Sequence, residues 1–299
     1  MSALPDDLRT AVETAIDASV VSIRRVSGGD INLAFRLAVD DGRSLFVKHH
    51  PQAPAGAYGA EAAGLAWLAE AHALRTPAVV AVGDDPRSRF LALDWIEGAT
   101  PVDAAGADAA ERFGRALAAL HRHGSPAFGL HEDNLIAGLP QENAPCDTWA
   151  DFYAERRLEP LARRAVARGR LSSGFLTRLE RLRPRLAELC GPHEPPARLH
   201  GDLWNGNAAI DAEGFPVVVD PAVYGGHREM DLAMMHLFGG FPEATFAAYA
   251  EAYPLAEGHE WRRELFQLAP ILVHVCLFGG GYARSADRIL ARHLTGAAG

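Results

Sequence analysis

The sequence predicts an α+β fold in two parts, a small antiparallel β-sheet with one main helix followed by a larger, mainly helical part. The main observation is a change of period. Short runs of alternating apolar residues occupy the first part of the chain, whereas helical spacing dominates from residue 108 onward. The length of 299 residues is enough for two modest domains. We therefore expect one domain over residues 1–97 and a second over residues 98–299.

The N-terminal part begins with apolar residues at helical spacing, which predict a helix between Leu4 and Ala18. Alternating and β-branched runs then predict three strands, at residues 20–26, 32–39 and 43–49. The last two are joined by an Asp-Gly turn, which supplies the left-handed backbone of a tight hairpin. The other elements expected here are a helix at residues 55–73 and strands at residues 78–82 and 90–96.

The C-terminal part is expected to be helical from residue 108, and a proline-rich stretch at residues 191–196 ends its third helix. Its first helix closes with His121 and His123, where imidazoles are expected to interact with the C-terminal helix dipole. Two short strands then flank a polar loop at residues 200–207, and helices resume from Arg228.

Composition excludes several classes of protein. Hydrophobic residues make up 48% and charged residues 22%, which is typical of a globular chain rather than a disordered or fibrous one. The formal net charge of −9 opposes general binding to nucleic acid. Three separated cysteines predict neither a disulfide framework nor a zinc site. The start lacks the features of a secretory signal and no apolar run is long enough for a membrane span, so we expect a cytoplasmic protein without membrane contacts.

The polar loop carries the most specific pattern, because Asp202 and Asn207 follow His200 and a third oxygen-bearing residue, Asp220, ends the next apolar run. Their side chains are expected to converge, and such oxygen ligands suit Mg²⁺ bound together with nucleotide phosphates. The spacing H-x-D-x-x-x-x-N matches the catalytic loop of protein kinases. On that interpretation Asp202 is the catalytic base, whereas Asn207 and Asp220 hold the metal.

A kinase also needs a lysine on its third strand, and Lys48 ends the third predicted strand. Its partner is expected to be Glu61 in the next helix, with Glu70 as the alternative. The predicted turn containing Gly28, Gly29 and Asp30 would bring backbone N–H groups close to the phosphates of ATP.

Adenine is expected at the end of the last strand of the small part. There the backbone amide and carbonyl groups from Asp94 to Ile96 would pair with the base.

Together these stretches resemble the fructosamine kinase (ketosamine-3-kinase) family within the aminoglycoside-phosphotransferase-like kinases. The motifs that carry the resemblance are Gly28-Gly29-Asp30-Ile31-Asn32, Phe46-Val47-Lys48, His200-Gly201-Asp202-Leu203-Trp204-Asn205-Gly206-Asn207, and residues 220–234 and 238–241. The middle stretch from Phe128-Gly129 to Trp149 fits as well, so the resemblance covers about residues 20 to 285. It implies a protein-kinase-like two-lobe fold and ATP-dependent phosphorylation of the 3-hydroxyl of a ketosamine. The unstable product would then release its amine, which amounts to deglycation.

Two departures from related sequences matter. Many members of the family carry a cysteine where this chain has Asp30, so thiol-based control through that turn is not expected here. Asp220 is followed by Pro221 and Ala222 rather than by the phenylalanine and glycine of protein kinases. The second departure argues against a mobile activation segment, and hence against a regulated protein kinase.

A pocket for a sugar joined to an amine is expected to contain flat side chains and a few polar groups. The candidates for it are Trp204, Tyr224, His227, Glu229 and Asn134. Trp149 is more simply explained as a core residue. Asp231 is interpreted either as a helix N-cap or, preferably, as an acceptor for amides of the catalytic loop. The expected partners are small ketosamines or glycated lysines on proteins, and the chain is expected to be a monomer or a weak dimer.

Two alternatives stay open. One is a kinase of the same fold that acts on another substrate, such as an aminoglycoside, choline or homoserine. It is disfavoured by Trp204, since choline and aminoglycoside kinases typically carry histidine there, and by the Gly226-His227-Arg228-Glu229 stretch. The other is a catalytically silent ATP-binding module, which is disfavoured because Lys48 and the three oxygen-bearing residues are all intact.

Overall fold

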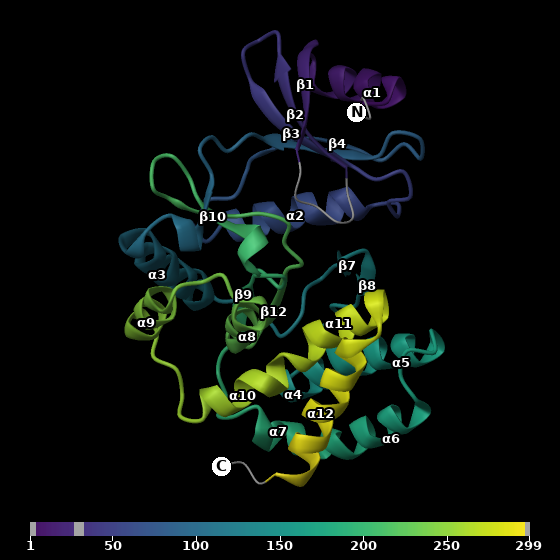
Figure 1. Cartoon of the computed structure of the whole chain (residues 1–299), viewed down its shortest axis with the longest axis vertical. Helices are drawn as coiled ribbons and strands as arrows, with labels where there is room; N and C mark the ends of the chain where they lie inside the picture. The colour runs from purple at the N-terminus through teal and green to yellow at the C-terminus, as the bar shows by residue number, and fades with distance from the viewer. Residues whose placement is uncertain (1–3, 27–32, 297–299) are drawn as a thin grey trace.

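The computed structural model describes residues 4–26 and 33–296, and Figure 1 shows a sheet with two helices above a larger group of helices. The sheet is antiparallel, with strand order β1-β2-β3-β5-β4. Its strands are β1 (Val20–Val26), β2 (Leu33–Val39), β3 (Ser44–His49), β4 (Val79–Gly83) and β5 (Phe90–Asp94). With α1 (Asp6–Ile16) and α2 (Ala57–Ala69) it forms the N-terminal lobe. The predicted α+β architecture is confirmed.

Period-two alternation assigns the residues of β3 to the two faces of the sheet. Leu45 and Val47 are fully buried in the cluster formed with α1, whose Leu8 is also fully buried. Phe46 points to the opposite face and packs against the cluster that contains Leu65 of α2. The alternation therefore places the next residue of the even series, Lys48, on the face that α2 covers.

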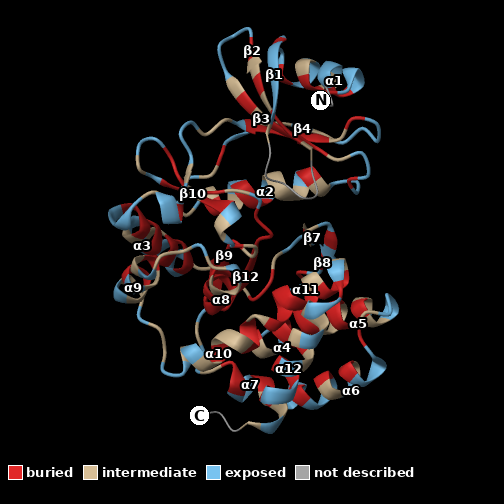
Figure 2. Cartoon of the chain, viewed as in Figure 1, coloured by how far each residue is buried: buried red, intermediate tan, exposed pale blue. Residues whose placement is uncertain are grey.

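The C-terminal lobe holds the remaining helices. They are α3 (Ala107–His123), α4 (Trp149–Phe152), α5 (Glu159–Ala167), α6 (Ser173–Leu182), α7 (Leu186–Leu189), α8 (Glu229–Phe238), α9 (Glu243–Ala252), α10 (His259–Phe266), α11 (Leu268–Phe278) and α12 (Gly281–Thr295). Figure 2 shows that α8 and α11 are mostly buried among their neighbours, although each ends in an exposed phenylalanine. No helix in residues 4–26 and 33–296 combines the length and apolarity that a membrane crossing requires.

Short strands organise the loops of this lobe. They are β6 (Thr100–Pro101), β7 (Asn134–Ile136), β8 (Leu139–Gln141), β9 (Ala197–Leu199), β10 (Ala208–Ile210), β11 (Pro216–Val218) and β12 (Tyr224–Gly226). The two strands that border the polar loop belong to different sheets, since β9 pairs with β12 whereas β10 lies between β11 and β6. The loop thus connects two sheets, and each of its ends is held by the strand pairing of a different sheet.

The predicted helical region is interrupted after residue 147. A π-helical segment, Tyr153–Leu158, lies between α4 and α5, and it carries the buried Arg157. Such segments widen a helix locally and occur where a side chain must be redirected. The helical spacing of the sequence does not indicate this interruption.

The packing of α3 on α9 generates a prediction about Gly114. A β-carbon at this position of α3 would clash with the carbonyl of Thr245 and lie 3.0 Å from the backbone nitrogen of Tyr249. Because both neighbours are backbone atoms, Gly114→Ala is expected to destabilise the protein by about 1–3 kcal/mol despite its better helix propensity. The free energy of unfolding in denaturant provides the measurement.

The same substitution in α6 is the matched control. A β-carbon on Gly174 would meet only the hydroxyl of Ser172, at 3.7 Å. Gly174→Ala should therefore raise stability by roughly 0.5–1 kcal/mol. Equal effects of the two substitutions would show that the close approach of α3 and α9 is not what requires Gly114.

Candidate active site

The ammonium group of Lys48 joins the two lobes. Its Nζ lies 2.9 Å from Oδ1 of Asp220 and forms an ion pair with Oε2 of Glu61. The Lys48 side chain is only 4% exposed, so the charge has left bulk water and depends on these carboxylates. The predicted partner Glu61 is therefore the one that the structure brings to Lys48. Glu70, the alternative, instead lies 3.0 Å from Arg198.

The charges of this group shift one another. Burial lowers the pKa of Lys48, but Asp220 and Glu61 outweigh burial and raise it above the ordinary value for lysine. Burial raises the pKa of Glu61. The charge of Lys48 lowers this pKa in part, whereas the neighbouring Asp220 carboxylate raises it further. Burial also raises the pKa of Asp220, but the Lys48 ammonium outweighs it and holds the pKa below its usual value. Lys48 is thus held as a cation and Asp220 as an anion.

The loop between β9 and β10 is tied to the segment that follows β11. The imidazole Nε2 of His200 is 2.9 Å from the carbonyl of Val219, and the amide of Val219 donates to the carbonyl of Asn207 at 3.0 Å. The His200 carbonyl also accepts the amide of Ala222 at 2.9 Å. Because Asp220 lies between the two anchored residues, these bonds fix it beside the loop.

Asp202 and Asn207 meet within the loop. Nδ2 of Asn207 donates to the carbonyl oxygen of Asp202 at 2.9 Å and to its Oδ2 at 3.3 Å. Burial raises the pKa of Asp202 to about 7, with further contributions from the negative charges of Asp220 and Asp231. A carboxyl group with this pKa can take up a proton near neutral pH, as a general base must.

Asp231 fixes the start of the loop through hydrogen bonds to its backbone. Its carboxylate accepts the backbone N–H of His200 at 2.8 Å and that of Gly201 at 2.9 Å. These are the loop amides that the preferred interpretation of Asp231 required. The side chain also contacts Nε2 of His121 at 3.2 Å. Burial raises the pKa of Asp231, but the hydrogen bond and charge of His121 outweigh it and lower the pKa.

The interpretation of His121 as a dipole-capping residue is wrong. Its side chain is buried, and Nδ1 lies 2.8 Å from the hydroxyl of Tyr249 while Nε2 faces Asp231. The imidazole therefore bridges α3 to α8 and α9 instead of interacting with solvent at a helix end. Helical spacing could not reveal this role, because its partners are more than a hundred residues away.

Two residues of the site have left-handed backbones. Asp220 has φ +53°, which is uncommon for a residue other than glycine. Gly201 has φ +83°, and a β-carbon there would clash with the carbonyl of Ala222. The absence of a side chain at Gly201 is thus what lets the loop approach the segment after Asp220 so closely.

The group of oxygen donors fits a divalent cation. Asp202 and Asp220 each carry a carboxylate, and the charge of Asp220 raises the pKa of Asp202, so the two repel one another. Asn207 uses its Nδ2 for Asp202, whereas its Oδ1 accepts no hydrogen bond within residues 4–26 and 33–296. A hard cation bound by these oxygens would offset the repulsion. Asn207 and Asp220 are therefore suitable metal ligands.

The structure describes only some of the residues that are predicted to contact the nucleotide. Gly28, Gly29 and Asp30 lie outside the described residues. The N–H of Asp94 donates to the carbonyl of Ala78 at 2.9 Å, so this amide is already bonded. Ile96 follows the last strand, and its backbone makes no hydrogen bond within the part of the chain that the structure describes. Ile96 therefore keeps its donor and acceptor for the predicted adenine contact.

The candidate substrate residues divide into two groups. Trp204 is 39% exposed within the catalytic loop, where its ring covers Gly206. Tyr224 is buried, and the guanidinium carbon of Arg157 lies 3.9 Å from the centre of its ring. Asn134 donates to the carbonyl of Val223 at 2.8 Å. Trp204 is thus the exposed aromatic candidate, whereas the others support the segment after Asp220.

His227 and Glu229 lie deeper in the C-terminal lobe. Glu229 forms a two-pronged ion pair with Arg262, at 2.7 and 3.0 Å. The ring of His227 packs against Trp149 and Phe266, and Trp149 is a core residue as expected. The substrate roles of His227 and Glu229 stay predictions, and these contacts do not support them.

Sequence reasoning did not identify the residues that support this region. Arg157 stacks on Tyr224 and donates to the carbonyl of Glu142 and to Oδ1 of Asn143, each at 2.6 Å. Arg228 forms a two-pronged pair with Glu194, at 2.6 and 2.8 Å. No local spacing marks these residues, because each partner is supplied by a distant part of the chain.

Comparison with known proteins agrees with this geometry. The model of the family described as "Fructosamine kinase" matches residues 7–296. A Synechocystis protein named "Probable ketoamine kinase" is 41% identical over 91% of this chain and 90% of its own length. The Arabidopsis thaliana protein-ribulosamine 3-kinase is 34% identical over 98% of this chain and 90% of its own.

A crystal structure from Thermobifida fusca, assigned as a candidate fructosamine-3-kinase, superposes with a TM-score of 0.87. The two sequences are 41% identical, and the superposition covers 98% of this chain and 100% of the other. Because the family match spans nearly the whole sequence, both lobes and the junction that Lys48 makes are included. The chain belongs to the fructosamine kinase family.

Proposed function

We propose that this protein is an ATP-dependent kinase that phosphorylates ketosamines, the adducts formed when sugars react with amines. One observation carries the proposal: Lys48 of the N-terminal lobe is ion-paired to Asp220 of the C-terminal lobe, beside the Asp202–Asn207 loop. That arrangement supplies a cation for phosphates, oxygen ligands for a metal and a base for a hydroxyl group. The family to which the chain belongs supplies the substrate class.

The finer features of the proposal are the position of transfer and the metal. We infer transfer to the 3-hydroxyl of the sugar and use of Mg²⁺. The Arabidopsis relative supports the first, since that protein is named a ribulosamine 3-kinase. The hard oxygen donors Asn207 and Asp220 support the second. Bound there, Mg²⁺ would neutralise charge on the phosphates of ATP.

In the proposed mechanism, the residues of this chain mainly position the reactants and offset charge. Lys48 contacts the phosphates while Glu61 and Asp220 hold its ammonium in place. Asp202 orients the sugar hydroxyl and accepts its proton at a carboxylate oxygen. Asp231 keeps the loop amides fixed, so that Asp202 stays aimed at the hydroxyl.

We further propose that residues 1–97 bind the nucleotide and residues 98–299 supply the catalytic loop and substrate contacts. Trp204 supports this division, because it is an exposed flat side chain next to Asp202 on which a sugar face can pack. The site of action that we propose is the cytoplasm. All three cysteines are free thiols, which suits a reducing compartment.

ATP consumption with defined acceptors tests the function. Fructosamine- or ribulosamine-bearing lysine is expected to support turnover because the family and the site both favour ketosamines. Choline and kanamycin are the matched controls and should leave ATP consumption at the background rate. Turnover with either control but not with a ketosamine would establish the alternative kinase, and no turnover with any acceptor would favour a silent module. A glycated peptide in parallel would separate free from protein-bound substrates.

The role of Asp202 generates a second prediction. Asp202→Asn keeps the size of the side chain but removes its ability to accept a proton. We expect turnover to fall by roughly 10²–10⁴-fold with ATP affinity largely unchanged. Steady-state kinetics and nucleotide titration measure the two effects.

The pH profile of the native enzyme provides the check on this role. Because Asp202 must be ionised to act as a base and its pKa is raised to about 7, kcat/KM should fall as the pH drops below 7. A profile that stays flat from pH 5.5 to 8, or near-normal turnover by the Asn variant, would contradict the assignment of Asp202 as the base.

Glu61 and Glu70 provide a matched pair of variants in one helix region. Glu61→Gln removes a carboxylate from the buried Lys48, so kcat/KM for ATP is expected to fall at least about tenfold. Glu70→Gln removes a carboxylate that is 63% exposed and pairs with Arg198, so its effect should be less than about threefold. Larger loss in the Glu70 variant would mean that the ion pair with Glu61 does not position Lys48 for catalysis.

A further inference from the structure

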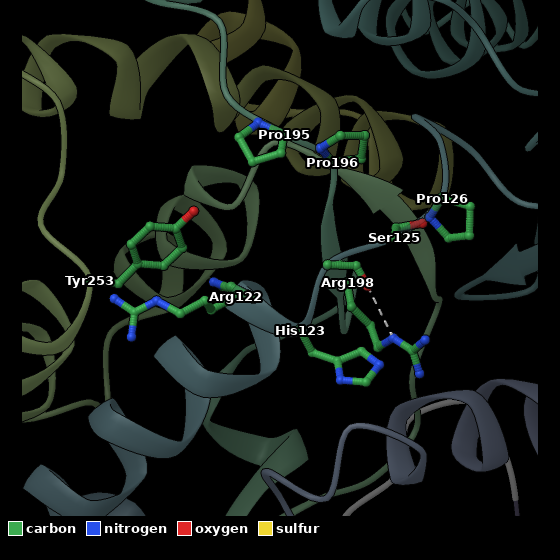
Figure 3. Close-up of a pocket in the computed structure, with 10 residues that line it drawn as sticks. Arg122, His123, Ser125, Pro126, Pro195, Pro196, Arg198 and Tyr253 are labelled. Atoms are coloured by element: carbon green, nitrogen blue, oxygen red, sulfur yellow. Dashed lines mark hydrogen bonds between the residues drawn. The ribbon is translucent and has the colours of Figure 1, made fainter.

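A cavity of about 430 Å³ opens on the C-terminal lobe, apart from the residues of the proposed active site. It lies where the end of α3, the loop before β9 and the residue after α9 come together. Figure 3 shows Pro195 and Pro196 along one edge, Tyr253 to one side, Arg198 to the other and His123 between them. A hollow of this size is within the range of small-molecule binding sites.

The walls of this cavity are cationic, although the chain as a whole carries a formal charge of −9. Two arginines, Arg122 and Arg198, line it, and none of its lining residues in the described chain is a carboxylate. Arg198 pairs with Glu70, whose side chain is 63% exposed and therefore screens Arg198 only weakly, whereas the buried Asp231 pairs with His121. The cavity is thus a local positive region on an acidic protein.

Arg198 is the buried arginine of this lining, with a side chain that is 6% exposed. Its Nη1 donates to the carbonyl of Trp67 and lies 3.0 Å from Glu70, and its Nε makes a long contact of 3.4 Å with the carbonyl of Gly124. Its second terminal nitrogen, Nη2, has no hydrogen-bond partner within residues 4–26 and 33–296. A buried guanidinium with a free donor is suited to an anionic oxygen.

Arg122 lies on the other side of the hollow, and its guanidinium also has nitrogens without a hydrogen-bond partner in the described chain. Its guanidinium stacks over the ring of Tyr253, 4.7 Å from the ring centre, and Nη2 donates to the carbonyl of Ala252. Nε and Nη1 have no partner in the described part of the chain. Guanidinium groups recognise phosphate with paired N–H donors, whereas the apolar faces of the two prolines suit the body of a small organic molecule.

We propose that this cavity is a binding site for a small phosphate ester, such as a sugar phosphate. The phosphate group interacts with Arg198 and His123, and the rest of the ester extends along the two prolines toward Arg122. The volume exceeds what inorganic phosphate alone would fill, and the apolar walls would be left uncovered by it. The ligand is therefore an ester rather than the free anion.

The site lies next to the supports of the proposed active site. His121 forms part of its wall and contacts Asp231, which accepts the amides of His200 and Gly201. Arg198 belongs to β9 and donates to the C-terminal end of α2, the helix that carries Glu61. A bound ester thus contacts both of the elements that hold the catalytic loop and the Lys48 ion pair.

Isothermal titration with ribose 5-phosphate tests this proposal. The full-length protein is first saturated with ADP and Mg²⁺, so that the nucleotide site is occupied and cannot account for binding. We expect a single saturable site for ribose 5-phosphate and no binding of ribose. The double variant Arg122→Gln/His123→Gln should weaken binding at least about tenfold, since it removes charge-assisted contacts.

Arg115→Gln is the matched control, because Arg115 lies on α3 two turns before Arg122 and does not line the cavity. This variant should bind the ester as the native protein does. Both variants alter exposed side chains, and unchanged thermal unfolding would show that each is folded.

The proposal is overturned if the native protein binds no ester, if the double variant binds normally, or if Arg115→Gln weakens binding equally. Inorganic phosphate that binds as tightly as ribose 5-phosphate would overturn the assignment of an ester. Because titration requires no phosphoryl transfer, its outcome is independent of whether the protein phosphorylates ketosamines.

Discussion

The ammonium group of Lys48 is the constraint on which the rest of the structure depends. A cation that is almost completely removed from water is stable only when carboxylates surround it, and here they are supplied by α2 and by the segment after β11. The three elements must therefore meet at one point. Gly64 of α2 permits this, since a β-carbon there would already lie 3.2 Å from Val223 of the same segment. One buried charge and one close approach thus help to fix the relative position of the two lobes.

The catalytic loop is held by polar bonds to rigid elements instead of by its own conformation. Asp231 on α8 accepts two of its amides, and His200 and Asn207 bond to Val219, which directly precedes Asp220. Buried networks of this kind are costly when incomplete and rigid when every member is bonded. Such a loop can place a carboxylate for chemistry without reorganisation, which is what phosphoryl transfer requires of a protein.

Buried arginines have a different use in each part of the C-terminal lobe. Arg262 and Arg228 each form a two-pronged pair with a glutamate, so their charges are balanced inside the fold. Arg157 uses both terminal nitrogens for carbonyl oxygens and stacks on the rings of Phe152 and Tyr224, although its Nε has no partner in the described chain. Arg198 differs from them, because its acid is at the surface and one of its terminal nitrogens is free in the described chain. That difference separates structural arginines from one that can bind a ligand.

The sequence by itself determined the α+β architecture, the strand that carries Lys48, and the grouping of Asp202, Asn207 and Asp220, because alternation, helical spacing and a short polar motif are local properties of the chain. Tertiary structure decided the rest. In the folded protein His121 contacts Asp231 instead of only lying at a helix end. The two strands around the catalytic loop belong to separate sheets, and Glu229 is buried against Arg262. Those outcomes depend on partners supplied by distant segments, and a pattern in neighbouring residues carries no information about which distant groups will neutralise a buried charge.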